Sequence, residues 1–333
     1  ELYHGPTLSF KDFGARFLAT CLSRLSLDDV TTILVATSGD TGSAVASAFH
    51  GKANIRVMVL FPKGQISQRQ QQQITCWGDN VLAMAVKGNF DDCQRLVKDA
   101  LVDPWWQQYT RLNTSNSINI GRLLPQMTYY AFHSWRWKQQ TQQSARFIVP
   151  SGNLGNVTAA HMAKQLGFPI DQIVMSLNAN TVVKTYLSTG QLQPQASVAT
   201  LANAMDVGDP SNLERLQSLF GDVNDLRQHT LAISASDADI QYVIAEVDQQ
   251  YHREVCPHTA TACYARHQLS SEPWLIAATA DPCKFEQVLE PVLGREIPPT
   301  PALQTLLSRP HSMQTIPVDD QALKAQYEAT FIS

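Results

Sequence analysis

The stretch TTILVATSGDTGSAVASAFHG, residues 31–51, decides the fold class. It opens with an apolar, β-branched run at 31–36, which predicts a buried strand. A glycine-containing turn follows at 38–42, and residues 43–50 then have the character of a helix that Gly51 ends. A strand that leads through a short turn into a helix is the repeating unit of a parallel sheet.

The same unit recurs on both sides of this stretch. Apolar runs predict further strands at 55–62, 80–86, 145–150, 172–178 and 273–280. Helical patterns follow them at 66–78, 90–103, 157–166 and 284–294. The sequence therefore predicts an α/β fold with mostly parallel strands and helices on both faces. The polar residues QQTQQS at 139–144 mark the expected boundary between domains 1–140 and 141–333.

Composition narrows the class of partner. The 333 residues are 44% hydrophobic and carry a net charge of −4, which gives no electrostatic basis for binding nucleic acid or an anionic membrane. No apolar run has the length of a membrane-spanning helix. The six cysteines are Cys21, Cys76, Cys93, Cys256, Cys263 and Cys283. They show neither a C-x-x-C pair nor metal-ligand spacing, so we expect reduced thiols, no metal and a cytoplasmic enzyme.

Two turns after predicted strands have residues suited to binding anions. Ser38–Gly42 combines two glycines with hydroxyls beside a helix start, and Ser151–Asn156 can wrap a phosphate in backbone N–H groups. Each could equally be a structural turn with a capped helix. The second turn lacks the G-x-G-x-x-G spacing of a dinucleotide site. We expect both turns at neighbouring strand ends of a sheet, facing one cleft with Lys11 between them.

Lys11 stands between Phe10 and Asp12 at the expected start of a helix. A lysine that loses its proton in a pocket can form a Schiff base with an aldehyde, whereas a surface lysine would simply pair with Asp12. A phosphate-bearing aldehyde, pyridoxal phosphate, would account for the lysine and the two turns together.

Six motifs in order resemble the threonine synthase family: GPTLSFKDFGARF, ATSGDTGSAVA, NTSNSINIGRLLPQ, PSGNLGN, NAMDVGDPSN and PHTATACYA. This family has the tryptophan-synthase β-like fold, known as fold type II of the pyridoxal-phosphate enzymes. The resemblance implies two open, mostly parallel α/β sheets with helices on both faces, the lysine and substrate loop lying in 1–140 and the cofactor-phosphate loop in 141–333. Because the family carries a helical segment before the lysine motif, the resemblance also implies that this chain is N-terminally truncated.

The resemblance assigns roles residue by residue. Lys11 matches the lysine that holds the cofactor and moves protons, and Thr279 matches the hydroxyl residue facing the pyridine nitrogen. The loop that holds the cofactor phosphate corresponds to Gly152, Asn153, Leu154, Gly155 and Asn156. The substrate loop corresponds to Ser38, Gly39, Asp40 and Thr41, and the grip on the substrate phosphate to Ser117, Asn119 and Arg122.

The implied activity is that of a carbon–oxygen lyase in threonine biosynthesis, which converts O-phospho-L-homoserine and water to L-threonine and phosphate. A monomer or homodimer is expected. Two alternatives remain: a threonine or serine dehydratase, which would need no second phosphate grip, and a degenerate relative without turnover. The departures from the family pattern are Asp281 where histidine is usual, Thr181 where aspartate is common, Leu154 for phenylalanine and Gln65 for a cationic residue.

Overall fold

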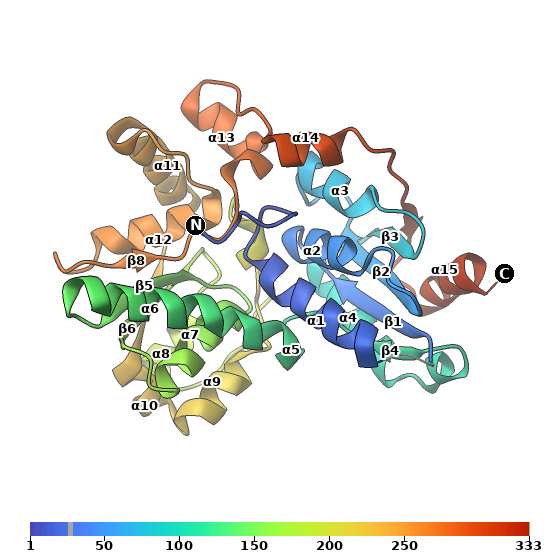
Figure 1. Ribbon diagram of the computed structural model, residues 1–333, viewed down its shortest axis with the longest axis horizontal. Helices are drawn as coiled ribbons and strands as arrows, with labels where there is room; N and C mark the ends of the chain where they lie inside the picture. The colour runs from blue at the N-terminus through green and yellow to red at the C-terminus, as the bar shows by residue number, and fades with distance from the viewer. Residues whose placement is uncertain (26–28, 333) are drawn as a thin grey trace. The chain divides into compact units, whose positions relative to one another are not determined.

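The computed structural model describes residues 1–25 and 29–332 (Figure 1). The chain forms two compact units, each built on its own sheet. The five-stranded unit comprises His4–Arg122 and Pro299–Ser333, and the four-stranded unit comprises Glu1–Tyr3 and Leu123–Pro298.

The five-stranded unit has a wholly parallel sheet in the order β4-β1-β2-β3-β9. Its strands are β1 (Thr31–Ala36), β2 (Ile55–Pro62), β3 (Val81–Val86), β4 (Arg111–Asn113) and β9 (Gln314–Ile316). Its helices are α1 (Lys11–Leu25), α2 (Asp40–Phe49), α3 (Gln68–Thr75), α4 (Phe90–Val102), the 3₁₀ turn η1 (Pro104–Gln108), the start of α5 (Ile120–Leu123), α14 (Pro301–Leu307) and α15 (Asp320–Phe331).

Alternation along the strands explains why both faces of this sheet are covered. Ile33 and Val35 of β1 pack in one apolar cluster with side chains of α1, α2 and α3. Leu34 and Ala36 point to the opposite face and pack with α4 and α15. Strands β1 and β3 are therefore buried at every position and mostly apolar, as a sheet covered on both faces requires.

The four-stranded unit also has a parallel sheet, in the order β7-β6-β5-β8. Its strands are β5 (Ala145–Pro150), β6 (Ile170–Leu177), β7 (Thr230–Ser234) and β8 (Leu275–Ile276). Its helices are α6 (Met127–Thr141), α7 (Gly155–Gln165), α8 (Val182–Thr189), α9 (Leu213–Phe220), α10 (Val223–His229), α11 (Asp237–Tyr251), α12 (Pro257–His267) and α13 (Glu286–Leu293), with 3₁₀ turns η2 (Leu124–Gln126), η3 (Asn203–Met205) and η4 (Pro282–Lys284).

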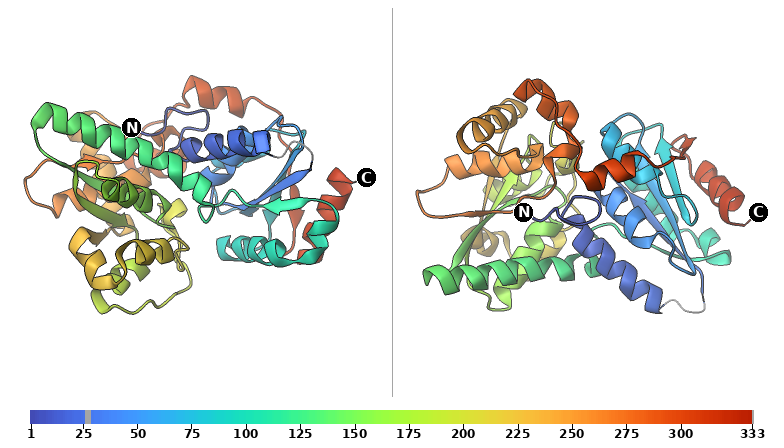
Figure 2. Two further views of the ribbon diagram at one scale, coloured as in Figure 1. Left: turned by 60° about the horizontal axis from the view of Figure 1, so that its bottom comes forward. Right: turned by 45° about the horizontal axis from the view of Figure 1, so that its top comes forward.

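Helices cover both faces of this second sheet as well. Ile148 of β5 and Val174 of β6 pack against Ala262 and Ala265 of α12, which runs beside α11 (Figure 1). On the other face α6 lies along α7 and β5, as the green helices in Figure 2 show. The fold class predicted from the sequence is confirmed: two parallel α/β sheets, each with helices on both faces.

Several sequence expectations need correction. The turns at Ser38–Gly42 and Ser151–Asn156 follow strands of different sheets, so the expectation of neighbouring strand ends on one sheet is wrong. The strand predicted over 273–280 is only Leu275–Ile276, because Ala278 turns away to accept a hydrogen bond from the N–H of Leu2 at 2.9 Å. Strands β4, β7 and β9 were not predicted, since they are short and partly exposed.

The compact units differ from the predicted domains 1–140 and 141–333 in three segments, which are Glu1–Tyr3, 123–140 and Pro299–Ser333. Helix α6 packs on α7 and β5, and the whole predicted boundary region at 139–144 lies in the four-stranded unit. The C-terminal residues from Pro299 belong to the five-stranded unit, because β9 pairs with β3 and α15 packs with α4. Across the described residues no helix combines the length and apolarity needed to cross a membrane.

His161 is a buried titratable group in the four-stranded unit. Its ring lies edge-on to Phe220 with the centroids 5.0 Å apart, and neither ring nitrogen has a hydrogen-bond partner among the described residues. Burial lowers the pKa of His161 to about 3, with a further contribution from Lys164 and His229. The imidazole is therefore neutral in the folded protein at neutral pH, and packs as an aromatic ring.

We expect His161 to make the folded state less stable as the pH falls below about 6.5. The unfolded chain then binds a proton that the folded chain does not bind, which lowers the free energy of unfolding by about 1.4 kcal/mol per pH unit. His161→Phe keeps the ring and removes the titration. Urea unfolding at pH 7.5 and 5.5 should show the free energy of unfolding falling by about 1.4 kcal/mol less in this variant. The exposed His311→Phe is the control and should behave like the parent; equal pH slopes for parent and His161→Phe would contradict the assignment.

Candidate functional site

The segment before Lys11 is held by several contacts, and these fix the position of Lys11 at the start of helix α1. The Asp12 carboxylate accepts hydrogen bonds from the backbone N–H of Thr7 at 2.9 Å and from its hydroxyl at 2.6 Å. A Cβ at Gly5 would lie 2.4 Å from the same carboxylate, so only glycine fits there. Helix α1 begins at Lys11, as the sequence predicted.

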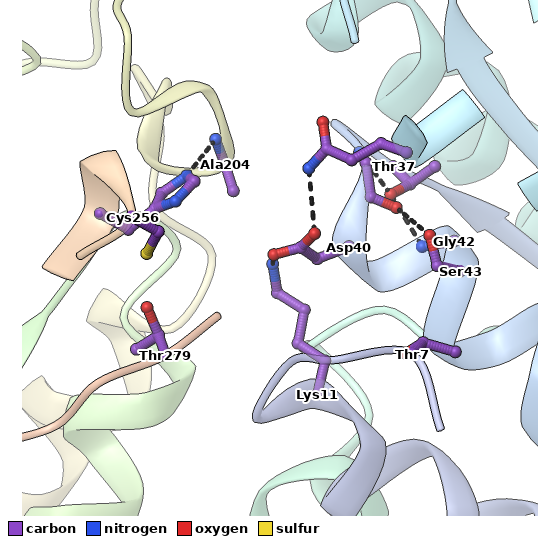
Figure 3. A network of polar contacts seen from close by, with 12 residues as sticks. Thr7, Lys11, Thr37, Asp40, Gly42, Ser43, Ala204, Cys256 and Thr279 are labelled. Atoms are coloured by element: carbon purple, nitrogen blue, oxygen red, sulfur yellow. Dashed lines mark hydrogen bonds and ion pairs between the residues drawn. The ribbon is translucent and has the colours of Figure 1, made fainter. Parts of the chain in front are cut away.

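Lys11 forms an ion pair with Asp40 at the start of α2. The Nζ atom lies 3.9 Å from Asp40 Oδ2, and the two side chains are 14% and 4% exposed. Asp40 Oδ1 accepts a second contact, from the Gln70 side-chain amide at 2.9 Å (Figure 3). The lysine therefore stands beside a buried carboxylate, in a setting unlike that of a solvated surface lysine.

The Ser38–Gly42 turn is organised by Thr37, which the sequence reasoning did not single out. The Thr37 hydroxyl accepts from the N–H groups of Gly39 and Gly42 at 2.9 and 2.8 Å. Gly39 has φ +132°, a conformation that favours glycine. Ser38 and Thr41 are half-buried at the N-terminus of the ten-residue helix α2. A hydroxyl residue directly after the strand was the available signal for Thr37.

The predicted substrate-phosphate motif lies in the same unit. Asn116 binds both the C=O and the N–H of Ala36, at 2.7 and 3.2 Å, and so attaches this loop to the end of β1. Asn119 is held by Thr114 and Gly121, and Ser117 is half-buried. The motif and the Ser38–Gly42 turn are therefore tied to one strand end.

Arg122 is buried, with only 2% of its surface exposed. One guanidinium nitrogen donates to the backbone oxygen of Ser115, and the Arg122 carbonyl packs so closely on α1 that a Cβ at Gly14 would lie 2.4 Å from it. The Ser115 hydroxyl is buried without a protein hydrogen bond in the part of the chain described. A buried cation beside an unsatisfied hydroxyl is a setting suited to an anionic ligand.

In the four-stranded unit, Gly152–Asn156 connects β5 to the eleven-residue helix α7. A Cβ at Gly152 would lie 2.6 Å from the Met205 Cα, so the loop and η3 touch backbone to backbone. Asn153 is fixed by the N–H of Ser211 and the side chain of Asn212, both at 2.7 Å. Leu154 adopts a left-handed conformation with φ +61° where the helix begins.

Asn156 joins this loop to α6. Its Oδ1 accepts from the hydroxyls of Tyr129 and Tyr130 at 2.5 and 2.9 Å, while its buried Nδ2 has no partner within the described chain. The first N–H groups of α7, which starts at Gly155, have no partner further back in the helix. A helix N-terminus with an unused buried donor fits a phosphate group.

Thr279 lies buried at the end of the segment that continues β8. Its N–H donates to the Thr259 hydroxyl at 3.3 Å, and Cys256 Sγ accepts from the Thr259 N–H at 3.4 Å to cap α12. His258 Nε2 accepts from the N–H of Ala204 at 3.1 Å (Figure 3). His258 and Thr259 belong to the motif PHTATACYA but received no role from the sequence. Proline at the first position of the helix, Pro257, was the signal for the cap at Cys256.

Two departures from the family pattern have local explanations. Asp281 accepts from the N–H of Cys283 at 2.9 Å and caps η4, so its carboxylate has a structural use. Thr181 precedes α8 without capping it through its side chain, a contact that an aspartate there could make. Among residues 1–25 and 29–332, no cluster of histidine, cysteine, aspartate or glutamate is arranged to hold a metal ion.

Comparison with known proteins agrees with this geometry. The family described as pyridoxal-phosphate dependent enzyme matches residues 1–275. Threonine synthase of Serratia marcescens is 43% identical over 322 residues, covering 95% of this chain and 74% of that protein. The crystal structure of threonine synthase from Escherichia coli superposes with a TM-score of 0.92 at 38% identity, covering 99% of this chain and 77% of that one. Pyridoxal-phosphate-bound threonine synthase from Brucella melitensis gives a TM-score of 0.89 at 30% identity, covering 100% and 78%.

Four observations point to the same family: the sequence motifs, the two parallel sheets, the lysine beside a buried carboxylate and these similarities. The chain belongs to the threonine synthase family of pyridoxal-phosphate-dependent enzymes.

Proposed function

We propose that this chain converts O-phospho-L-homoserine and water to L-threonine and phosphate. The observation that carries the proposal is the ion pair of Lys11 with the buried Asp40, at the start of α1, in a chain 43% identical to a threonine synthase. A lysine amine that is protected from bulk water and held by a carboxylate can exchange protons with a bound substrate.

The residues present fit pyridoxal phosphate, the cofactor of this family. Lys11 would hold it covalently, the Gly152–Asn156 loop would bind its phosphate, and the Thr279 hydroxyl would meet its ring nitrogen. The buried Asn156 Nδ2 and the N-terminus of α7 support the phosphate assignment. When bound, the cofactor supplies an electron sink that lets carbon–hydrogen bonds next to the substrate amine ionise.

The remaining chemistry falls to the side chains of the five-stranded unit. Ser38, Gly39, Asp40 and Thr41 would position the amino-acid end of the substrate, while Ser117, Asn119 and Arg122 would hold its phosphate. Lys11 would take the proton from Cα and return protons as phosphate leaves Cγ and water adds at Cβ. The buried guanidinium of Arg122 supports the phosphate assignment, because its planar fork can pair two phosphate oxygens.

We further propose a cytoplasmic location, with a small-molecule substrate as the partner. The six cysteines are all free thiols. Burial raises the pKa of Cys93 and of Cys263 to about 12, which keeps these thiols protonated and unreactive. The expectation of a monomer or homodimer stays a prediction.

Lys11→Ala should abolish covalent attachment of the cofactor, because the variant has no amine at that position. After borohydride reduction of the parent, mass spectrometry should place the adduct on the peptide containing Phe10, Lys11 and Asp12. The exposed Lys63→Ala is the control and should retain the adduct. An adduct on Lys63 or Lys284 in the parent would refute the assignment of Lys11.

Gly152→Ala should weaken binding of pyridoxal phosphate tenfold or more and leave the weaker binding of pyridoxal little changed. The new Cβ would meet the Met205 backbone and displace the loop assigned to the phosphate. Loss of one charge-assisted contact, about 1.5–3 kcal/mol, is enough for that effect. Gly167→Ala in the same unit is the control, since open space surrounds it and the cost is only backbone strain. Equal losses for the two cofactor forms would mean that the loop does not hold the phosphate.

Arg122→Lys should lower kcat/KM for phosphohomoserine by about one to two orders of magnitude, because lysine pairs as a point charge and cannot fork. Arg122→Ala should lower it further and also lower the melting temperature, since the guanidinium supports Ser115. The cofactor spectrum should stay normal in both. The exposed Arg16→Ala in α1 is the control. If both Arg122 variants turned over phosphohomoserine at the parental rate, the result would count against the proposed substrate. So would a parent that turns over serine or threonine faster than phosphohomoserine.

A further inference from the structure

We propose that Gln70 is a positioning residue of this site. Its side-chain amide fixes the Asp40 carboxylate beside Lys11 and thereby keeps a single negative charge next to the lysine amine. The role of Lys11 in turnover rests on the proposed function. The contact between Gln70 and Asp40 does not depend on it.

The three side chains form a chain of contacts from α3 through α2 to α1. Gln70 is fully buried and its Nε2 lies 2.9 Å from Asp40 Oδ1. The other carboxylate oxygen, Oδ2, lies 3.9 Å from Lys11 Nζ (Figure 3). One carboxylate thus faces an amide on one oxygen and an ammonium on the other, and both contacts favour its ionised form.

The orientation of the Gln70 amide is determined by α3 itself. Ser67 caps this helix by accepting from the Gln70 N–H at 3.0 Å, and the Ser67 N–H donates to Gln70 Oε1 at 3.3 Å. Because a backbone N–H can only donate, Oε1 must face Ser67 and Nε2 must face Asp40. A reciprocal cap of this kind therefore aims a donor at the carboxylate.

The backbone of the substrate loop confirms how closely this amide is fitted. Gly39 has φ +132°, and a Cβ there would lie 2.5 Å from Gln70 Nε2. A glycine that precedes Asp40 thus lets the main chain approach the amide. The other charged side chains on the three helices are Asp12, Arg16 and Arg24 on α1 and Arg69 on α3; α2 carries only Asp40. Asp12 is turned to Thr7.

Gln70→Glu isolates the amide's contribution. The new carboxylate can still accept from the Ser67 N–H and keep the cap, but it has no donor for Asp40. Two carboxyls at hydrogen-bond distance share one proton at low pH, and the protonated one then donates as the amide does. As the pH rises the shared proton is lost, and two negative charges beside Lys11 favour its protonated form.

The first readout is the rate at which Lys11 is acetylated in the cofactor-free protein, followed by mass spectrometry of its peptide. At pH 8, Gln70→Glu should be labelled about tenfold more slowly than the parent, since one added charge at this distance is a pKa effect of about that size. Lys63 in the same sample is the internal standard. The exposed Gln68→Glu in the same helix makes an equal change of net charge and should match the parent.

The second readout is turnover of phosphohomoserine from pH 6 to 9. The ratio of kcat for Gln70→Glu to kcat for the parent should fall about tenfold over this range, while the ratio for Gln68→Glu stays level. Normal labelling of Lys11 in Gln70→Glu would overturn the role of Gln70. Slow labelling of Lys11 in Gln70→Glu, together with a parent that forms no reducible adduct with the cofactor, would instead count against the proposed function and leave the Gln70 contact supported.

A double variant, Gln70→Glu with Asp40→Asn, supplies the rescue. The asparagine amide can donate to the new carboxylate, which restores the hydrogen bond with a single negative charge. Labelling of Lys11 should return to the parental rate or exceed it, because that charge is now further from the amine. If Gln70→Glu alone does not fold, recovery of folding in the double variant supports the coupling. Absence of any recovery overturns it.

Discussion

All strands of both sheets run parallel to their neighbours, and the other features of the site depend on this constraint. Parallel strands end at one edge of their sheet, so every turn that leads into a helix opens at that edge. In the five-stranded unit this edge carries the Ser38–Gly42 turn, and in the four-stranded unit it carries Gly152–Asn156. Each turn ends at a helix N-terminus, where partial positive charge and unused N–H groups favour anions.

Within each unit, neighbouring helices and loops hold the polar turn at the strand end in place. Asn116 attaches the loop that precedes Arg122 to the end of β1, and Gln70 attaches α3 to the Ser38–Gly42 turn. In the four-stranded unit, Met205 packs on Gly152 and Asn212 binds Asn153. These supports use side chains and backbone that do not themselves carry the assigned chemistry. Their common effect is to keep short polar loops in one conformation, which binding to a small ligand requires.

The sequence predicted the parts whose signal is local. Strand β1 is a β-branched and largely apolar run and Gly51 follows the next helix, so the strand and helix at 31–51 were recognisable from pattern alone. Lys11 was placed correctly at a helix start. By contrast, β9 has three residues, two of them exposed, and pairs with β3 from more than 200 positions away. No periodicity within a three-residue segment can indicate such a pairing.

The site was predictable as motifs and not as contacts. Arg122 was singled out, but its burial depends on the close approach of Gly14, which belongs to another helix. Gln70 carried the capping signal S-x-x-Q after Ser67, yet nothing in that signal says that its amide also faces Asp40. The resemblance implied that the two turns lie on two sheets, but the polar stretch at 139–144 did not mark where the chain leaves the five-stranded unit, which is after Arg122.

The two bonds between Asn116 and Ala36 have a consequence for how the motion of this loop can be observed. The Asn116 side chain continues the β4 side of the ladder with one donor and one acceptor, so the Ala36 amide is held by a side chain and not by a neighbouring strand. Its proton can exchange with solvent only when that side chain withdraws. The exchange rate of this one amide therefore reports how often the loop opens. It can be measured without a substrate and separately from global unfolding.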